Sequence, residues 1–378
     1  METYKLSDLC EILDAKRKPL SALQRAKKQG IYPYYGAQGI IDHLDEYLLD
    51  GEYLLVAEDG ANLETRNQPI ANIAKGKIWV NNHAHVLGSN GKCPLNLLGF
   101  ILNNMNISPY VTGCAQPKLN QENLRNIEIE LPSHIDSIAS ILSSLDRKIE
   151  LNNKINADLE EMAQAIFKNW FVDFEPFKDG KFVDSELGMI PEGWKVVVFD
   201  NILKVTTTKT GKEGIPEYSV TNTGIHPRDE KFTKNLSKSS AKNKLIRKGN
   251  LVFGMSREIL NWGIMKEEVG GVSSAYNVYI VDEKIVNTTY LECFIAQRMD
   301  YFADLIKPAS REGQGVDKAL LMKKIICIPP SEVMDVFLEK YNSIKLLTEI
   351  RNQESSRLSL LRDTLLPRLM SGELEVPE

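Results

Sequence analysis

The most regular hydrophobic pattern in the chain begins at Ile138 and repeats in alternating steps of four and three residues. Such a repeat is typical of a helix that pairs with another helix along one apolar stripe. A second pattern of this kind begins 199 residues later, at Phe337. We therefore predict two long coiled-coil helices. Their apolar seam positions are Ile138, Leu142, Leu145, Ile149, Leu159 and Ile166 in the first helix, and Phe337, Tyr341, Ile344, Leu358 and Leu365 in the second.

Both apolar stripes become polar near their centres. Asn152 and Asn156 interrupt the first stripe, and Thr348, Arg351 and Ser355 interrupt the second. Buried polar side chains reduce the stability of a coiled coil and fix its register, so matched polar layers indicate that the two helices pair with each other. Because a long segment separates the helices in the sequence, we expect an antiparallel pair. In the alternative interpretation, each helix packs only on its own domain.

The chain as a whole repeats one plan twice, with a period too long for a solenoid. A loop at Gln116, a short apolar strand and a Pro-Ser pair follow one another, and the same series recurs 198 residues later at Gln314. The first residues of each unit also match, since 4–6 resemble 194–196. This repetition predicts two related domains, each followed by one of the long helices.

Short apolar runs predict the elements inside each domain. In the first domain we expect strands at 53–57, 78–80 and 85–87 and a helix at 94–106; in the second, strands at 251–253 and 278–281 and a helix at 289–306. Prolines and glycines between the two units predict a linker. The expected boundaries are 1–132 for the first domain, 133–175 for the central helix, 176–193 for the linker, 194–330 for the second domain, and 331–378 for the C-terminal helix and tail.

These elements predict an α/β fold class. We expect two mixed α/β domains separated by two long antiparallel coiled-coil helices, arranged as a pseudo-twofold tandem repeat. The composition agrees with folded domains, since 43% of the 378 residues are hydrophobic and 26% are charged. The five cysteines are widely spaced and include no C-x-x-C pair, so we expect buried free thiols. With no signal-peptide pattern and no long apolar segment, we expect a cytoplasmic protein.

The net charge of −5 argues against a simple basic DNA-binding protein. The charge is uneven, however, because residues 194–330 carry 21 basic and 15 acidic side chains. Lysine clusters such as Lys16 with Lys18 therefore have two interpretations. They contact phosphates, or they form an ordinary solvated surface.

The sequence lacks the usual catalytic motifs. It has no phosphate-binding loop of the G-x-x-x-x-G-K-[ST] type, no G-x-G-x-x-G and no G-x-S-x-G. His83 and His85 have the spacing of metal ligands on one face of a strand, but no cysteine or third histidine lies near them. We therefore expect no metal site and no enzyme activity in this chain.

The loops of both domains are rich in side chains that bind nucleic-acid bases. Asn and Gln can form two hydrogen bonds with adenine, and Arg can do so with guanine. The alternative is that these loops are plain turns. The candidate DNA-binding residues are Lys16, Lys18, Tyr35, Gln38, Asn62, Asn82, His83, Gln116 and Lys118 in the first domain, and Ser256, Arg257, Asn261, Ser274, Tyr276, Asn277, Arg311 and Gln314 in the second.

Several segments resemble the specificity subunits of type I restriction-modification systems. The segments 170–176 (WFVDFEP) and 184–194 (DSELGMIPEGW) are similar to the central region of that family, and 361–374 is similar to its C-terminal region. The loops 34–39 (YYGAQG) and 58–62 (EDGAN) look like those of one recurrent type of target recognition domain. The second domain lacks these loop motifs, so its DNA contacts cannot be transferred from the first.

The resemblance implies a subunit that reads a bipartite site in double-stranded DNA, with one half-site for each domain. It also implies that the paired helices dock two methyltransferase subunits and that restriction subunits join the complex. S-adenosylmethionine, ATP and magnesium would then belong to those partners, and this chain would bind no cofactor. A specificity subunit of a related type II system and a coiled-coil scaffold without base recognition remain alternatives.

Overall fold

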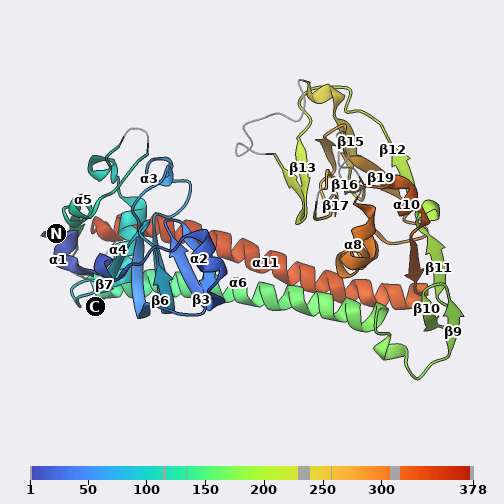
Figure 1. Cartoon of the computed structure of the whole chain (residues 1–378), viewed down its shortest axis with the longest axis horizontal. Coiled ribbons are helices and arrows are strands. Elements are labelled where there is room, and N and C mark those ends of the chain that lie inside the picture. Colours follow the sequence, from blue (N-terminus) through green and yellow to red (C-terminus); the bar gives the residue numbers. More distant parts are fainter. Residues whose placement is uncertain are drawn as a thin grey trace. The chain divides into compact units, whose positions relative to one another are not determined.

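The computed structural model describes residues 2–113, 116–132, 134–228, 239–256, 258–306 and 316–374. The chain forms two compact units. Unit 1 contains Met1–Lys154 and Ile350–Glu378, and unit 2 contains Ile155–Glu349. Helices α6 (Ile135–Phe171) and α11 (Ser331–Met370) therefore each contribute one part to unit 1 and the other part to unit 2 (Figure 1).

Unit 1 is built on a six-stranded sheet with the strand order β2-β7-β5-β6-β3-β4. Neighbouring strands are antiparallel except β3 and β6, which are parallel. The strands are β2 (Cys10–Ile12), β3 (Gln29–Gly36), β4 (Gly39–Leu44), β5 (Leu49–Ala57), β6 (Ala71–Val80) and β7 (Ala84–Ser89). A separate antiparallel pair joins β1 (Glu2–Lys5) to β8 (Glu128–Leu131).

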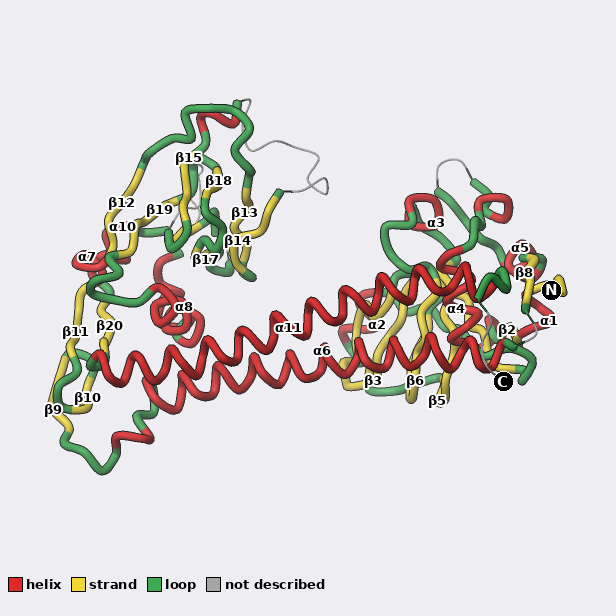
Figure 2. The backbone as a smooth tube through the Cα atoms, turned by 180° about the vertical axis from the view of Figure 1, so that it is seen from behind, coloured by secondary structure: helices red, strands yellow, loops and turns green. Residues whose placement is uncertain are grey.

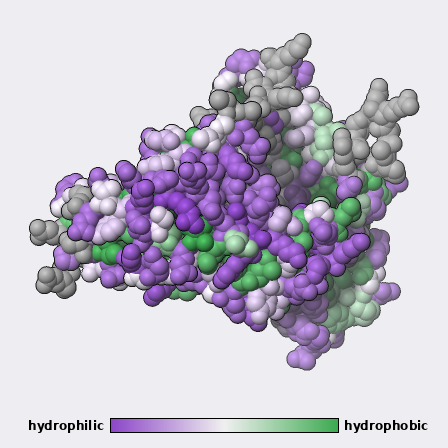
Figure 3. Space-filling model, turned by 60° about the vertical axis from the view of Figure 1, so that its left-hand side comes forward, coloured by the Kyte–Doolittle hydropathy of each residue, from purple (hydrophilic) through white to green (hydrophobic). Residues whose placement is uncertain are grey.

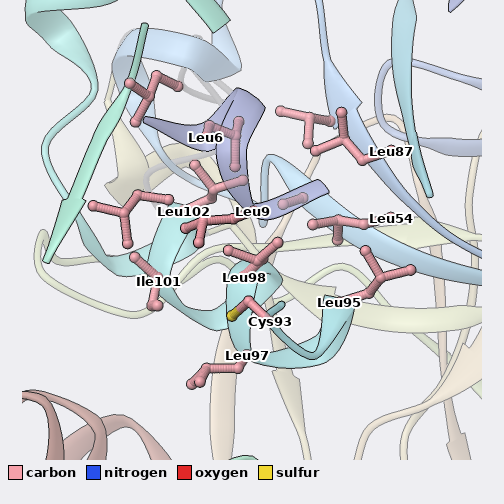
Figure 4. Close-up of a cluster of buried hydrophobic side chains, with 14 of the residues drawn as sticks. Leu6, Leu9, Leu54, Leu87, Cys93, Leu95, Leu97, Leu98, Ile101 and Leu102 are labelled. Atoms are coloured by element: carbon pink, nitrogen blue, oxygen red, sulfur yellow. The ribbon is translucent and has the colours of Figure 1, made fainter. Parts of the chain in front are cut away.

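Helix α4 (Leu95–Asn104) packs on this sheet and closes the main core of unit 1. Leucine side chains from α4, from β5 and β7 and from the short helix α1 (Leu6–Leu9) meet in one cluster (Figure 4). A Cβ atom at Gly99 would lie 3.0 Å from Leu54 Cδ1, so glycine lets α4 approach β5 closely. The other helices of this unit are short: η1 (Asp14–Lys16), α2 (Ala22–Ala26), α3 (Asn62–Thr65), η2 (Ser108–Tyr110) and α5 (Gln121–Arg125).

Unit 2 contains a four-stranded antiparallel sheet with the order β12-β19-β16-β17. Its strands are β12 (Leu203–Thr206), β16 (Leu251–Phe253), β17 (Trp262–Ile264) and β19 (Asn277–Val281). Three further antiparallel pairs are β11 (Lys195–Val198) with β20 (Ile325–Ile328), β13 (Tyr218–Thr221) with β14 (Gly224–Pro227), and β15 (Lys244–Arg247) with β18 (Val269–Val272). The helices are α7 (Phe199–Ile202), η4 (Ser240–Lys242), α8 (Thr288–Gln297), α9 (Met299–Phe302), η5 (Ala303–Leu305) and α10 (Lys318–Lys323).

The two units repeat one topology, as the sequence predicts. The order β2-β7-β5-β6 in unit 1 corresponds to β12-β19-β16-β17 in unit 2. The terminal pair β1-β8 likewise corresponds to β11-β20, and α4 corresponds to α8. The predicted α/β class and tandem repeat are therefore confirmed, although unit 1 adds β3 and β4 to its sheet.

Within each unit, α6 and α11 run antiparallel and side by side (Figures 1 and 2). In unit 1, Asp146 Oδ1 lies 2.6 Å from Arg362 Nη1, and Lys148 Nζ lies 3.4 Å from Glu354 Oε2. In unit 2, Glu160 Oε2 lies 2.9 Å from Lys345 Nζ. Later residues of α6 thus meet earlier residues of α11, which confirms the antiparallel pairing.

The predicted seam positions face inward. Ile138, Leu142, Phe337 and Ile344 are buried. The others are half-buried: Leu145, Ile149, Leu159, Ile166, Tyr341, Leu358 and Leu365. By contrast, Leu151 and Ile350, which adjoin the seam in the sequence, are 49% and 52% exposed. The visible face in Figure 3 is mostly hydrophilic with separate hydrophobic areas.

A polar layer is present at the predicted place in unit 1. Asn152 is fully buried, and its Nδ2 donates to Glu354 Oε2 at 2.8 Å and to Ser355 Oγ at 3.3 Å. Its Oδ1 is buried and has no hydrogen-bond partner. A buried amide that finds its partners in only one register fixes that register at some cost in stability.

Two local predictions need correction. The segment 176–193, predicted as a linker, contains the hairpin β9 (Phe182–Ser185) and β10 (Gly188–Pro191), and Ile190 is buried in the core of unit 2. The predicted helix 289–306 is broken at Arg298, whose φ of −119° is not helical, into α8 and α9. Periodicity alone does not reveal such a break, because both pieces contribute buried apolar side chains to the same core.

The four cysteines in the described part of the chain are free thiols. Cys10, Cys93 and Cys327 are buried, and burial raises the pKa of each to about 12. Cys114 lies outside the described residues. No described helix is long and apolar enough to cross a membrane.

An aromatic cluster joins the helices to the core of unit 2. The ring of Phe167 in α6 lies 5.4 Å from that of Tyr290 and 5.8 Å from that of Phe337, between ring centroids. Phe171 lies 4.8 Å from Phe337 and 5.8 Å from Trp194. Residues from α6, α8, α11 and the chain before β11 therefore share one core.

We predict that Phe167→Ala destabilises the protein by about 3 to 5 kcal/mol, because it removes a buried ring and leaves a cavity. Urea unfolding followed by tryptophan fluorescence measures this change. The matched control is Met162→Ala on the same helix, where the side chain is 51% exposed and the change should stay within about 0.5 kcal/mol. Equal effects of the two substitutions would contradict the assignment of Phe167 to the core.

Candidate nucleic-acid interface

Backbone hydrogen bonds join three of the loops in unit 1 that carry candidate residues. The Glu58 N–H donates to His83 O at 2.9 Å, and the Leu119 N–H donates to Glu58 O at 2.8 Å. The Gly60 N–H also donates to Pro117 O at 3.1 Å. The loops at 58–60, 81–83 and 116–119 therefore form one continuous surface, although they lie up to 61 residues apart in the sequence.

Arg17 ties a fourth segment to this surface. Its Nη1 lies 2.5 Å from Glu58 Oε2 and donates to Ala84 O at 3.0 Å, while its Nη2 lies 3.2 Å from Asp14 Oδ2. The guanidinium is largely buried, with 15% of the side chain exposed. The contacts of Arg17 with Glu58 and Ala84 thus hold the segment that carries Lys16 and Lys18 against the loops, and the ion pair with Asp14 orients the guanidinium within that segment.

His85 lies beneath the surface and is fully buried. Its Nδ1 lies 2.6 Å from Asp14 Oδ2, and its Nε2 lies 2.7 Å from Leu119 O. Asp14 also accepts hydrogen bonds from Val86 N–H at 2.9 Å and from Gln121 Nε2 at 2.9 Å. The ring therefore links η1 and β7 to the loop that precedes α5.

The rim of the surface carries polar groups that reach solvent. Lys118 Nζ lies 3.2 Å from Glu58 Oε1, and the lysine is about half exposed. His83 Nδ1 lies 2.7 Å from Asp59 Oδ2. Lys118, His83 and Asp59 thus supply a cation, an imidazole and a carboxylate, which can meet a phosphate, a base acceptor and a base donor.

The remaining candidates of unit 1 take different positions. Tyr35 is half-buried in β3, and its carbonyl accepts the Asn81 N–H at 3.1 Å, which joins this strand to the 81–83 loop. Burial raises the pKa of Tyr35, so its hydroxyl stays protonated at neutral pH. The exposed candidates are Lys16, Lys18, Gln38, Asn82 and Gln116.

Asn62 does not present its amide to solvent. The residue is 5% exposed, its Nδ2 donates to Gln68 O at 2.9 Å, and its Oδ1 accepts the Gln68 N–H at 3.0 Å. Both polar groups are thus used inside the protein. Asn62 therefore holds the 62–68 loop in place.

Sequence reasoning did not identify the residues that support this surface, which are Asp14, Arg17, Glu58, His85 and Gln121; of these, Asp14 and His85 are buried. The only available signal was the His83-x-His85 spacing, which suggested two rings on one strand face. Instead, His83 precedes β7 and is half exposed, while His85 is inside it and buried. In the described part of the chain, no three His, Cys, Asp or Glu side chains gather in a way that could hold a metal ion.

In unit 2 the candidate residues are less exposed. Ser256 is buried and its Oγ accepts the Asn261 N–H at 2.9 Å, while Asn261 Nδ2 donates to Met255 O at 2.5 Å. Asn277 is buried in β19. Ser274 is exposed and Tyr276 is half-buried, with its carbonyl 2.5 Å from Lys244 Nζ. Arg257, Arg311 and Gln314 lie outside the described residues.

Comparison with known proteins gives a consistent result. The first 161 residues match the sequence model of the type I restriction modification DNA specificity domain. The chain is 30% identical over 289 residues to the type I restriction enzyme MjaIX specificity subunit of Methanocaldococcus jannaschii; the match covers 70% of this chain and 65% of that protein. It is also 27% identical over 380 residues to S.HindORF215P of Haemophilus influenzae, a candidate type I specificity subunit, with 97% and 95% coverage.

The chain belongs to the family of type I restriction-modification specificity subunits. Its fold is also similar to the crystal structure of the S subunit of a type I restriction-modification system from M. genitalium, with a TM-score of 0.52 and 13% identity over 100% of this chain and 96% of that one. The family match at residues 1–161 includes every loop of the unit 1 surface. As a specificity subunit, the chain has a role in DNA specificity, and the polar surface of unit 1 is its best-defined candidate interface.

Two carboxyl groups of this specificity subunit, the buried Asp14 and the half-buried Glu58, have a pKa below the ordinary value. Burial alone would raise the pKa of Asp14, but the hydrogen bond and charge of His85, the Val86 N–H and Arg17 together lower it below its ordinary 3.8. Burial also opposes ionisation of Glu58, and Arg17, His85 and Lys118 together lower its pKa below 4.5. Both carboxylates are therefore ionised at neutral pH.

A carboxylate whose pKa is lower in the folded than in the unfolded state stabilises the fold above its unfolded pKa, and this contribution disappears as pH falls through the folded value. We therefore predict that Asp14→Asn destabilises the protein by about 3 kcal/mol at pH 7. The difference from the wild type should shrink as pH is lowered from about 5 towards 3. Urea unfolding at several pH values measures it.

The control is Asp50→Asn, because Asp50 is an exposed residue of β5 in the same unit. Its effect should remain within about 0.5 kcal/mol at every pH. A loss from Asp14→Asn that stayed constant down to pH 3 would show that the carboxylate charge does not stabilise the fold.

Proposed function

We propose that this chain is the non-catalytic subunit that selects the DNA sequence of a type I restriction-modification complex in the cytoplasm, and that each domain reads one half of a bipartite site. The observation that carries the proposal is the repeated topology. The same strand order occurs in two units that share one pair of antiparallel helices. Two related readers attached to a common support suit a site with two separated halves.

The loops of unit 1 support base reading. Gln38, Asn82 and Gln116 are exposed amides, which can each give and accept a hydrogen bond at a base edge. Asp59 and His83 add a carboxylate and an imidazole 2.7 Å apart. Because backbone bonds and Arg17 already fix these loops, little conformational entropy remains to be lost on binding.

Some of the basic side chains form ion pairs within the protein, so fewer of them are available for phosphates than their number suggests. Lys28 and Lys248 pair with Glu46 and Glu268, and Arg25 pairs with Asp42. Lys16 and Lys18 remain exposed beside the candidate surface. With a net charge of −5, we propose that partner subunits supply part of the phosphate neutralisation.

The proposed partners are double-stranded DNA, two methyltransferase subunits docked along the helix pair, and restriction subunits. The methyltransferase subunits would bring S-adenosylmethionine, and the restriction subunits would use ATP and magnesium. On this proposal the chain contributes only shape, hydrogen bonds and spacing to the reaction.

Expression of the chain together with its methyltransferase subunit, followed by mapping of modified adenines in the host genome, tests the proposal. We expect modification at one motif with two specified halves and an unspecified gap. Modification at a continuous motif, or modification that is independent of this chain, would contradict the assignment.

We predict that Asn82→Ala relaxes the base preference at one or two positions of a single half-site, by about tenfold at each position, because a base contact contributes about 1 to 3 kcal/mol of discrimination. The matched control is Asn104→Ala in the same unit. Asn104 is also exposed, but its side chain donates to Phe100 O at the end of α4, away from the loops. The same genome mapping detects both effects, and an unchanged motif in the Asn82 variant would remove this residue from the interface.

A second prediction concerns the gap. Seven residues inserted between 154 and 155 in α6, together with seven between 349 and 350 in α11, extend both helices by about 10 Å without rotating the seam appreciably. We expect the unspecified gap to lengthen by about two to three base pairs, since each base pair rises about 3.4 Å. Both half-sites should keep their bases.

The control for that prediction is the same seven residues inserted after Gly372, beyond the end of α11. That insertion should leave the gap unchanged. An extended helix pair that modified the original motif would show that the helices do not set the spacing.

A further inference from the structure

We propose that His85 is a positioning residue for base recognition, that it acts as a doubly protonated imidazolium, and that the ion network around it sets the shape of the recognition loops in unit 1. This inference rests on the proposed function, because it explains what holds the surface that is proposed to read one half-site. The His85 ring is completely buried, and a hydrogen-bond acceptor faces each of its two nitrogens.

The protonation of His85 follows from its two partners. Leu119 O lies 2.7 Å from Nε2, and a carbonyl oxygen can only accept, so Nε2 must carry a hydrogen. Asp14 Oδ2 lies 2.6 Å from Nδ1. If Asp14 is ionised it too can only accept, and then both ring nitrogens carry hydrogens.

The surroundings of Asp14 show that it is ionised. Its Oδ1 faces the Val86 N–H at 2.9 Å, and its Oδ2 also faces Gln121 Nε2 at 2.9 Å and Arg17 Nη2 at 3.2 Å. A protonated Asp14 could donate only to Nδ1 of the ring, because its other neighbours are all donors. Those donors, one of them the charged guanidinium of Arg17, stabilise the carboxylate and not the acid. The proton between Asp14 and His85 therefore belongs to the ring.

All charged groups around the ring alternate in sign. Asp14 lies against Nδ1, and Glu58 Oε2 lies 3.9 Å from the same nitrogen. Arg17 bridges these two carboxylates, and Lys118 pairs with the second oxygen of Glu58. Loss of the imidazolium charge would leave two carboxylates close together with one less cation, in a region where charges are poorly screened.

In the part of the chain that the structure describes, this network adds side-chain links between loops that are also joined through backbone bonds. Through Asp14 and Arg17 it fixes the segment with Lys16 and Lys18, and through Leu119 it fixes the segment with Gln116 and Lys118. Through Glu58 it also fixes the adjacent residue Asp59, whose Oδ2 lies 2.7 Å from His83 Nδ1. A histidine that served only to fill the core would need no charge and no contact with these loops.

The first test is the protonation state of His85 in the full-length protein, measured by nitrogen NMR with labelled histidine at pH about 7.5. His85→Gln identifies its signals by their disappearance. We expect both ring nitrogens to be protonated at this pH. A neutral ring with a single protonated nitrogen would overturn the proposal.

The second test measures recognition by the complex of the full chain with its methyltransferase subunit. In the modified-adenine map, His85→Gln should weaken base preference by about tenfold across the half-site that Asn82→Ala affects, and should leave the other half-site intact. The matched control is His43→Gln, which makes the same chemical change at an exposed position of β4 in the same unit. We expect the His43 variant to modify the wild-type motif.

Arg17→Lys keeps the charge but cannot bridge Asp14 and Glu58 as a guanidinium does, so it provides a variant that is independent of His85. It should relax the same half-site even if the His85 variant fails to fold, which thermal unfolding will reveal. A wild-type complex without a bipartite motif would overturn the proposed function. A bipartite motif that neither folded variant altered would overturn only the role of the network.

Discussion

The candidate interface of this specificity subunit depends on a buried ionic interaction, the contact of the His85 ring with Asp14. Taking a carboxylate out of water costs several kcal/mol unless charges and hydrogen bonds replace the solvent. Asp14 receives such replacements from four groups on three segments of the chain: Arg17 in its own segment, His85 and Val86 in β7, and Gln121 in α5. The carboxylate is stable in the folded protein only when these segments meet. Their meeting fixes the positions of the loops at 58–60, 81–83 and 116–119.

A similar argument applies to the helices. Asn152 is buried where an apolar residue would be more stable, and its amide meets Glu354 and Ser355. A slip of one turn would leave the amide without these partners. Both helices contribute to both units, so register in the helix pair also determines which parts of α6 and α11 are available to each domain. Polar groups thus define the loops of the candidate interface as well as the pairing of α6 with α11.

Much of the architecture could be predicted from the sequence because it depends on local periodicity. The steps of four and three residues from Ile138 and Phe337 predicted two long helices, and the similar segments 199 residues apart predicted the repeated topology. The hairpin at 182–191 and the break at Arg298 could not be predicted, because their causes are tertiary packing and a single backbone angle. The buried network was also hidden, since Asp14 lies 71 residues from His85 and 107 from Gln121. The position of Asn62 was hidden as well. The sequence predicted an amide that contacts bases, but both polar atoms of the Asn62 side chain bond to the backbone of Gln68 in its own loop.

The central claim is that one domain, held in shape by its own buried charges, reads one half of the DNA site. Replacement of residues 1–132 by the corresponding domain of a relative with a known motif tests it most directly, with modified adenines mapped in cells that contain the methyltransferase subunit. The account predicts that one half-site changes to that of the donor while the other half-site and the gap are retained. A motif that stayed the same, or one in which both halves changed, would contradict it.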